Sequence, residues 1–343
     1  MTFNSLILIW FEQNKRNLAW RLTKNPYKIW LSEIILQQTR IAQGSAYYDR
    51  FVEEFPTIFD LANADEQAVL KLWQGLGYYS RARNLHFTAK QIAFELNGNF
   101  PNNFNDLKKL KGVGDYTAAA IASICFDEAV PAVDGNAYRV YARYFNIDLD
   151  IMTPQAKKYF FELGLEIIDQ ANPGDFNQAV MELGATVCTP KSPKCEICPV
   201  HESCEGLAKN RISDLPVKLK KIKVKNRYLH LLHISNEDKL LLKKQSGKDV
   251  WRNLFLFPMI EKENLDSKEL EQLMQVNFEI VHEEKHILTH QNLFITFWKS
   301  EVELSKFNQL SSFLESEIVI NKNLEYFPVP RPIEKYILDK ISH

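Results

Sequence analysis

The sequence predicts a protein of two parts, an all-α region over residues 1–206 and an α+β domain over residues 228–343. Three observations support this prediction. Apolar residues repeat at helical spacing through most of the first part, with short turn-forming stretches between the repeats. Four of the five cysteines crowd into residues 188–204, at the end of that part. After Cys204 the pattern changes to short runs rich in β-branched and aromatic residues, which are typical of strands.

The helices of the first part are expected one after another, separated by short turns. They cover 28–44, 65–75, 80–97, 115–125, 134–145, 154–170 and 175–186. The stretch "MTFNSLILIWFEQNKR" predicts an amphipathic first helix. It has no preceding basic residue and no small-residue cleavage site, so it does not resemble a signal peptide.

The second part is predicted to be a sheet with a few helices. The expected strands are "RYLHLLHIS", "KLLLKKQ", "LFLFPMI", "FEIVHEEKHILTH" and "LFITFWKS". Two helical patches, 266–275 and 332–341, lie among and after them. A basic linker over residues 207–227 joins the two parts, so we expect a multidomain protein.

Composition narrows the class of protein. Apolar residues make up 45% of the 343 residues, which is enough to build cores and excludes global disorder. The net charge of −1 does not point to nucleic acid, but a local basic stripe is sufficient for binding it. No run of about 18 apolar residues occurs, so we expect no membrane span and a cytoplasmic location.

The cysteines are spaced as Cys188-x6-Cys195-x2-Cys198-x5-Cys204. In a cytoplasmic chain such crowding favours metal binding over disulfides. Four thiolates this close can hold one [4Fe–4S] cluster. Structural zinc also accepts four cysteines, but usually from two C-x2-C pairs, and only one such pair occurs here. Spacing alone therefore favours iron–sulfur and leaves zinc as the alternative.

A glycine-containing turn between two helices is predicted by "LKKLKGVGDYTAAAIAS" at 107–123. Gly112 and Gly114 permit positive φ and let a phosphate approach backbone N–H groups at the start of the second helix. A single G-x-G turn is weak evidence, but three lysines flank this one. The combination indicates a sequence-independent contact with DNA phosphates.

Two carboxyl groups stand in unusual positions. Glu33 lies in "WLSEIILQQTR" (30–40), within the apolar face of an expected helix. Asp134 follows a short apolar run and precedes an amphipathic helix. From pattern alone Glu33 fits an ordinary helical glutamate and Asp134 fits a helix N-cap. An Asp in that position also stays ionised and can face a cleft.

The motifs together resemble those of the helix–hairpin–helix DNA glycosylases. "WLSEIILQQTR", "GLGYYSRARNL", "LKGVGDYTAAAI", "VDGNAYRV" and the cysteine pattern arrive in that superfamily's order. Within it, the chain looks most like the MutY-type glycosylases, which remove adenine opposite 8-oxoguanine. The resemblance is dense over residues 1–205 and loose beyond them. The lyase relative, endonuclease III, has a lysine where Tyr116 stands and lacks the counterpart of Glu33.

This resemblance implies roles for individual residues. Glu33 would be the general acid that protonates adenine at N7, and Asp134 would stay ionised and stabilise an oxocarbenium-like sugar. Asn136 and Tyr116 would position these groups. The adenine pocket would contain Arg21, Leu36 and Gln178. Contacts to DNA and to the opposite base would come from Gln38, Thr39, Leu76, Tyr78, Gly112, Gly114, Thr289 and His290. Cys188, Cys195, Cys198 and Cys204 would hold a [4Fe–4S] cluster.

The resemblance also implies a Nudix-like fold for the second part, which in MutY-type proteins recognises 8-oxoguanine. The R-E-x-x-E-E pattern of Nudix hydrolases is absent from 228–343, so no nucleotide hydrolysis is expected there. "ILTHQN" matches the family's Phe-Ser-His hairpin, with Leu288 in place of the aromatic residue. This change bears on discrimination of 8-oxoguanine from guanine rather than on the chemistry.

The expected activity is monofunctional base excision, without strand cleavage, because no lysine stands at the lyase position. The substrate would be duplex DNA with adenine opposite 8-oxoguanine or guanine. The protein would act as a monomer associated with the nucleoid. Two alternatives remain: a glycosylase for another mispaired base such as thymine, and a non-catalytic iron–sulfur protein that binds DNA.

Overall fold

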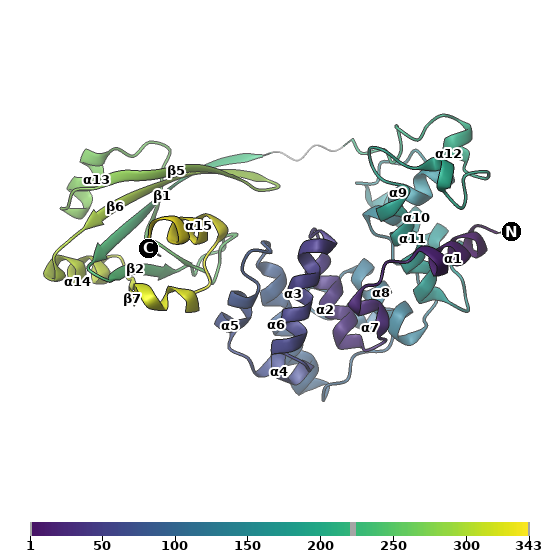
Figure 1. Ribbon diagram of the computed structural model, residues 1–343, viewed down its shortest axis with the longest axis horizontal. Coiled ribbons are helices and arrows are strands. Elements are labelled where there is room, and N and C mark those ends of the chain that lie inside the picture. Colours follow the sequence, from purple (N-terminus) through teal and green to yellow (C-terminus); the bar gives the residue numbers. More distant parts are fainter. Residues whose placement is uncertain (1, 220–223, 342–343) are drawn as a thin grey trace. The chain divides into compact units, whose positions relative to one another are not determined.

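The computed structural model describes residues 2–219 and 224–341, which form two compact units (Figure 1). The first unit comprises Met1–Asn63 and Asn84–Lys220, and the second Ala64–Arg83 and Lys221–His343. Residues 220–223 of the expected linker lie outside the described residues.

The segment Ala64–Arg83 belongs to the second unit, although the sequence had suggested the first. Hydrogen bonds explain this placement. Gln67 donates to the carbonyl oxygen of Tyr326 (3.0 Å), and Asn253 donates to the carboxylate of Glu66 (2.6 Å). Such contacts join residues far apart in the chain, so no local pattern could predict them.

The chain is helical up to residue 208, and no strand occurs among residues 2–208. The helices are α1 (Phe3–Asn14), the 3₁₀ helix η1 (Ala19–Leu22), α2 (Pro26–Leu36), α3 (Ile41–Glu54), α4 (Ile58–Asn63), α5 (Glu66–Leu72), α6 (Ser80–Lys90), the π-helical η2 (Gln91–Glu95), α7 (Phe104–Leu107), α8 (Asp115–Phe126), α9 (Gly135–Tyr144), α10 (Pro154–Ile167), α11 (Pro173–Thr186), the 3₁₀ turn η3 (Cys195–Ile197) and α12 (Glu205–Ala208). The all-α prediction for this region is confirmed.

One predicted helix, 28–44, is wrong because the structure contains two helices there. α2 ends at Leu36 and α3 begins at Ile41. Between them Gln38 has a left-handed backbone (φ 56°), which an α-helix cannot contain, and the Gln37 side chain donates to Thr117 Oγ1 (3.3 Å). The break exposes Gln38 in a turn instead of on a helix.

One hydrophobic cluster of the first unit lies between α1, α9, α10 and α11. Phe3, Ile7 and Phe11 are one apolar stripe of α1, and they pack into this core as the amphipathic pattern predicted. Phe160 of α10 and Phe176 of α11 are fully buried in the same cluster. The core fixes the ends of α9 and α11, which carry several of the expected site residues.

The second unit is built on one sheet. Its strands are β1 (Lys225–Asn236), β2 (Lys239–Lys244), β3 (Phe255–Leu256), β4 (Met259–Glu261), β5 (Glu279–Ile287), β6 (Gln291–Glu301) and β7 (Glu317–Ile320). The order is β3-β2-β1-β6-β5, with β4 paired to β1 and β7 paired to β2. β1 and β6 run parallel, from Lys225 beside Gln291 to Ser235 beside Glu301, and the other pairs are antiparallel.

Helices cover both faces of the sheet. Leu232 and Ile234 of β1 point to one face, where α13 (Ser267–Met274) and α14 (Leu304–Phe313) pack. His233 points to the other face, where its Nδ1 lies 2.9 Å from the hydroxyl of Tyr336 in α15 (Arg331–Lys340). The predicted α+β architecture is confirmed; α14 and β7 were not predicted. None of the helices among the described residues has the length and apolar character needed to cross a lipid bilayer.

Candidate active site and cysteine cluster

Glu33 is buried in the middle of α2, with 8% of its surface exposed. Its helix is apolar almost all round, and the residues on either side of Glu33 are buried too. Burial raises the pKa of Glu33 to about 7. The Tyr116 hydroxyl and the Arg21 charge act against this rise, and the charge of Asp134 adds to it. A carboxyl with this pKa can hold a proton near neutral pH and release it to a substrate.

Tyr116 lies in the first turn of α8 and faces Glu33. Its hydroxyl donates to Met181 Sδ at 3.3 Å. The hydroxyl has one proton, and a carboxylate is a better acceptor than a thioether. When Glu33 is ionised, the Tyr116 hydroxyl would therefore donate its hydrogen bond to the Glu33 carboxylate instead of to Met181. The phenol can thus stabilise the carboxylate that remains after Glu33 has given up its proton.

Asp134 caps the N-terminus of α9, as the sequence predicted. Its Oδ1 accepts from the backbone N–H of Asn136 (2.9 Å) and of Ala137 (2.8 Å), and its Oδ2 accepts from Asn136 Nδ2 (2.7 Å). Burial raises the pKa of Asp134, and these three donors oppose that rise by stabilising the carboxylate. The structure thus gives Asp134 the donors that an ionised carboxylate needs.

Asn136 connects Asp134 to an arginine. Its Oδ1 accepts from Arg139 Nη2 (2.7 Å), which also donates to the carbonyl oxygen of Gly184 (2.7 Å). Arg139 Nε donates to the carbonyl oxygen of Cys188 (2.7 Å). The amide of Asn136 is therefore held in one orientation, with its donor aimed at Asp134.

A cavity of about 500 Å³ opens between η1 and α11. Among the described residues, its lining includes Arg21 and Gln178 but not Leu36. Leu36 is the last residue of α2 and is half-buried. The structure brings together two of the three residues expected in an adenine pocket and leaves the third at a helix end.

The glycine hairpin joins α7 and α8. Position 112 requires glycine, because its φ is +80° and a Cβ there would stand 2.8 Å from Asn84 Cβ. Gly114 is the N-cap of α8, so the free N–H groups of that helix follow it. Lys108 pairs with Asp115 (2.6 Å) in an exposed ion pair. Exposed pairs are weak, so a DNA phosphate can compete for that lysine.

In the second unit, four expected contact residues line one cavity of about 1030 Å³. They are Leu76 and Tyr78 from the turn before α6, and Thr289 and His290 from the turn between β5 and β6. The hydroxyls of Tyr78 and Thr289 are hydrogen-bonded to each other. Six basic residues also line this cavity, namely Arg83, Lys225, Arg227, Lys248, Arg252 and Arg331.

Hydrogen bonds of Arg227 support the wall of the same cavity. Arg227 makes two hydrogen bonds to Asp249 (2.9 and 2.8 Å) and two to Glu261 (2.8 Å each). Its Nη1 also donates to Gln291 Oε1 (3.2 Å), next to the turn that carries Thr289. These bonds hold that turn against β1.

Gln38 and Thr39, two further residues expected to contact DNA, lie in the first unit, in the turn after α2.

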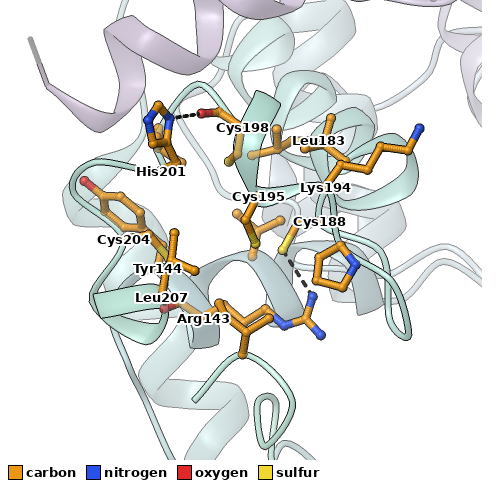
Figure 2. A pocket seen from close by; sticks show the side chains of 15 residues that line it. Arg143, Tyr144, Leu183, Cys188, Lys194, Cys195, Cys198, His201, Cys204 and Leu207 are labelled. Carbon is orange, nitrogen blue, oxygen red and sulfur yellow. Dashed lines mark hydrogen bonds between the residues drawn. The ribbon is translucent and has the colours of Figure 1, made fainter. Parts of the chain in front are cut away.

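The four clustered cysteines surround a second cavity of the first unit (Figure 2). Arg143 Nη1 lies 3.4 Å from Cys188 Sγ and also donates to the carbonyl oxygen of Thr189 (2.8 Å). In the part of the chain that the structure describes, no three Cys, His, Asp or Glu side chains are arranged to hold a single metal ion. The four cysteines that the spacing predicts as ligands thus lie around one cavity, where they would hold a [4Fe–4S] cluster.

Replacing Cys198 with Ser is expected to remove most of the broad visible absorption of iron–sulfur thiolate charge transfer. It should also lower the melting temperature, because cluster binding and folding are coupled. Cys125, a half-buried cysteine of α8 outside the cavity, supplies the matched control, and Cys125→Ser should keep the absorption. Unchanged absorption in Cys198→Ser would contradict the assignment of this ligand.

No sequence pattern singles out several residues that the structure places around these sites, among them Arg16, Arg139, Arg143 and Glu182. Glu182 is 1% exposed and accepts from both Arg16 and Arg21. One local signal existed, since Glu182 stands one helical turn after Gln178 on α11. Its arginine partners lie more than 160 residues away, so no pattern in the sequence connects them.

Comparison with known families agrees with this geometry. Residues 31–166 match the HhH-GPD superfamily of base excision DNA repair proteins. Residues 188–204 match the iron–sulfur binding domain of endonuclease III, and residues 230–339 match the NUDIX domain. The protein therefore carries a [4Fe–4S] cluster, and its C-terminal domain is Nudix-like.

Individual proteins give a more specific result. The adenine DNA glycosylase of Buchnera aphidicola subsp. Baizongia pistaciae is 34% identical, with 98% of this chain and 96% of that protein covered. The human adenine DNA glycosylase is 44% identical over 60% of this chain and 39% of its own. A thermostable thymine-DNA glycosylase structure matches with a TM-score of 0.56 and 30% identity, covering 60% of this chain and 95% of that one.

A trapped complex of endonuclease III with DNA has a TM-score of 0.52 and 22% identity, covering 60% of this chain and 94% of that one, which shows the shared fold. Two relatives that each cover 98% of this chain, and so reach into the second unit, are adenine DNA glycosylases. The chain belongs to the adenine DNA glycosylase family of helix–hairpin–helix base excision repair proteins.

Proposed function

We propose that this protein hydrolyses the N-glycosidic bond of adenine that stands opposite 8-oxoguanine or guanine in duplex DNA. One observation carries the proposal for the chemistry. Glu33 is buried and has a pKa of about 7, and the half-buried Asp134, whose charge helps to raise that pKa, accepts from three hydrogen-bond donors. Such a pair can serve as proton donor and carboxylate in glycoside cleavage.

The reaction needs the adenine outside the duplex, at a cost of a few kcal/mol that is lower for a mispaired base. Glu33 then donates its proton to N7 of the extruded base, so the leaving group departs neutral. The C1′–N9 bond breaks, and the carboxylate of Asp134 stabilises the positive charge that forms on the sugar. A water molecule then forms a bond to C1′ and releases a proton, which returns the Glu33 carboxylate to its acid form. Residues 188–204 would hold the [4Fe–4S] cluster, which would anchor that loop when bound.

We assign a separate role to each of the expected domains. Residues 1–206 excise the base, and residues 228–343 recognise the base opposite, with the segment that contains Leu76 and Tyr78 contributing to the same cavity. Arg227 is paired with Asp249 and Glu261, so a DNA phosphate backbone would meet the other basic residues of that cavity. The protein would act as a monomer on duplex DNA in the cytoplasm.

An excision assay tests this function directly. Under single-turnover conditions the protein should release adenine from duplexes with A opposite 8-oxoguanine and A opposite G. Preference for T opposite G would favour the other candidate function, that of a thymine glycosylase. This alternative is tested because the chain is similar to a thymine-DNA glycosylase structure. DNA binding without release of any base would instead indicate a non-catalytic protein.

The product should be an intact abasic strand. Schiff-base chemistry needs an amine, and Tyr116 occupies the position of the lyase lysine. We therefore expect strand breaks only after heat or alkali, as seen on a denaturing gel. Efficient scission with borohydride trapping of a protein–DNA adduct would contradict the monofunctional assignment.

The Thr289 and His290 side chains should set the preference for 8-oxoguanine. Replacing both with Ala should reduce the ratio of excision rates, 8-oxoguanine over guanine, by about 30-fold, because two hydrogen bonds are lost at about 1 kcal/mol each. Ser312→Ala, on the exposed side of α14, is the control and should leave the ratio unchanged. An unchanged ratio in the double variant would exclude this turn as the reader of the opposite base.

A further inference from the structure

The turn before α6 has an unusual backbone. Gly75, Gly77 and Tyr78 are left-handed, with φ of 96°, 70° and 48°. Glycine adopts this conformation readily, but for tyrosine it costs free energy and persists only where the surrounding structure holds it. Tyr78 is nevertheless 43% exposed, and its hydroxyl is hydrogen-bonded to that of Thr289 in the cavity of the second unit. Other contacts must therefore hold this turn in place.

Arg81, in the first turn of α6, contacts the turn at several points. Its Nη2 donates to the carbonyl oxygens of Leu76 (3.4 Å) and Gly77 (3.2 Å). Its guanidinium carbon lies 5.6 Å from the ring centre of Tyr78 and 5.0 Å from that of Trp73. Trp73 is fully buried, and its Nε1 donates to the same Gly77 oxygen (3.0 Å). One cation thus contacts both the backbone and the exposed ring of the turn.

Arg81 does not belong to the wall of the cavity. The described residues that line the cavity include Tyr78 and Arg83, but Arg81 is not one of them. Arg81 is half-buried, and burial lowers the pKa of its guanidinium to about 10, which leaves it charged at neutral pH. A charged guanidinium attracts an aromatic face, and its planar set of donors can reach two carbonyl oxygens. Arg81 is therefore placed to hold the turn and not to line the cavity itself.

We infer that Arg81 is a positioning residue for recognition of the base opposite adenine: it holds the turn at residues 75–78, and with it the Tyr78 ring, beside Thr289. The role rests on the proposed function, in which this cavity reads that base. A ring fixed in one position can favour one base over another, whereas a mobile ring adapts to both. Discrimination of 8-oxoguanine from guanine should therefore depend on Arg81 through Tyr78.

The test is equilibrium binding to duplexes that contain no base to excise, with a tetrahydrofuran abasic site opposite 8-oxoguanine or opposite guanine. The ratio of the two affinities measures discrimination without the excision step. Tyr78→Ala should reduce this ratio by about tenfold, within the range of a lost base–aromatic stacking contact. Arg81→Gln should reduce it by about fivefold, the scale of one lost cation–π contact.

A double-mutant cycle tests whether Arg81 acts through Tyr78. In the Tyr78→Ala background, Arg81→Gln should reduce the ratio no further. Losses that multiply would show that Arg81 acts independently, which would overturn the inference. An equal loss of affinity for both duplexes, with a salt dependence reduced by about one phosphate contact, would also overturn it, because Arg81 would then bind the DNA backbone.

Arg50→Gln is the matched control. Arg50 is exposed on α3, lies over the ring of Tyr47 (4.2 Å) and donates from Nε to the carbonyl oxygen of Ala46 (3.3 Å), so this variant loses the same kinds of contact outside the cavity. It should keep the wild-type ratio. If Arg81→Gln is too unstable to assay, Arg81→Met supplies a second variant, because it keeps the apolar length of the side chain and removes a half-buried charge. A wild-type ratio in Arg81→Met would equally overturn the inference.

The outcomes also distinguish this inference from the proposed function. Absence of adenine release by the wild type in the excision assay would overturn the function, and this role with it. A wild-type ratio in Tyr78→Ala would show that Tyr78 does not read the opposite base, so Arg81 could not act through it. A reduced ratio in Tyr78→Ala, with the wild-type ratio kept in Arg81→Gln and Arg81→Met, would overturn the role of Arg81 alone.

Discussion

Replacing Glu33 with Gln is expected to lower the single-turnover rate of adenine excision by about 10²–10⁴-fold, the usual contribution of a positioned general acid. Gln has nearly the same shape but no acidic proton, so the pocket should remain and DNA binding should be kept. The measurement is excision from a duplex with A opposite 8-oxoguanine, together with a binding titration on the same duplex. Glu54→Gln, on the exposed side of α3, is the control.

The stability of the same variant gives an independent check. The pKa of Glu33 rises from 4.5 to about 7 on folding. Between these values the folded state binds more protons than the unfolded chain, so Glu33 makes the protein less stable as pH rises from about 4.5 to about 7. Gln does not ionise, so Glu33→Gln should melt at or above the wild-type temperature at pH 8. A large loss of stability would mean that Glu33 is structural.

Replacing Asp134 with Asn should reduce excision by about 10²–10³-fold, the size of a lost electrostatic contact to a transition state. Asn is also a good N-cap, so α9 should keep its first turn and the melting temperature should change little. The amide carries no charge, and the cationic sugar loses its stabilising partner. Excision rate and melting temperature, measured on the same preparation, separate the two effects.

Asp266→Asn is the matched control, because Asp266 caps α13 through the same kind of bond, to the backbone N–H of Glu269 (2.8 Å). It should keep full excision activity. Equal activity in Asp134→Asn and the wild type would show that Asp134 is a helix cap and nothing more. Loss of folding in Asp134→Asn alone would point to the bonds from Asn136 as its main role.

Several parts of this structure follow from local sequence. The amphipathic stripe of α1, the cap at Asp134 and the turn at Gly112 each depend on residues close together in the chain. The cysteine spacing also confines its four ligands to one loop region. These features were predictable because their physical cause acts over a few residues.

Other parts depend on contacts between distant segments. The break between α2 and α3 is accompanied by a hydrogen bond from Gln37 to Thr117. Glu182 pairs with Arg16 and Arg21, which lie far from it in the sequence. β7 is only four residues long and forms by pairing with β2. Burial of Glu33, which gives it the pKa of a useful acid, is likewise a result of packing and not of its own helix.

The central claim is that Glu33 protonates the departing adenine at N7. The most direct measurement is single-turnover excision from a duplex in which 7-deazaadenine, with carbon in place of N7, stands opposite 8-oxoguanine. The claim predicts that the protein binds this duplex as tightly as the natural one and releases no base from it. Release of 7-deazaadenine at the rate of adenine would contradict the claim.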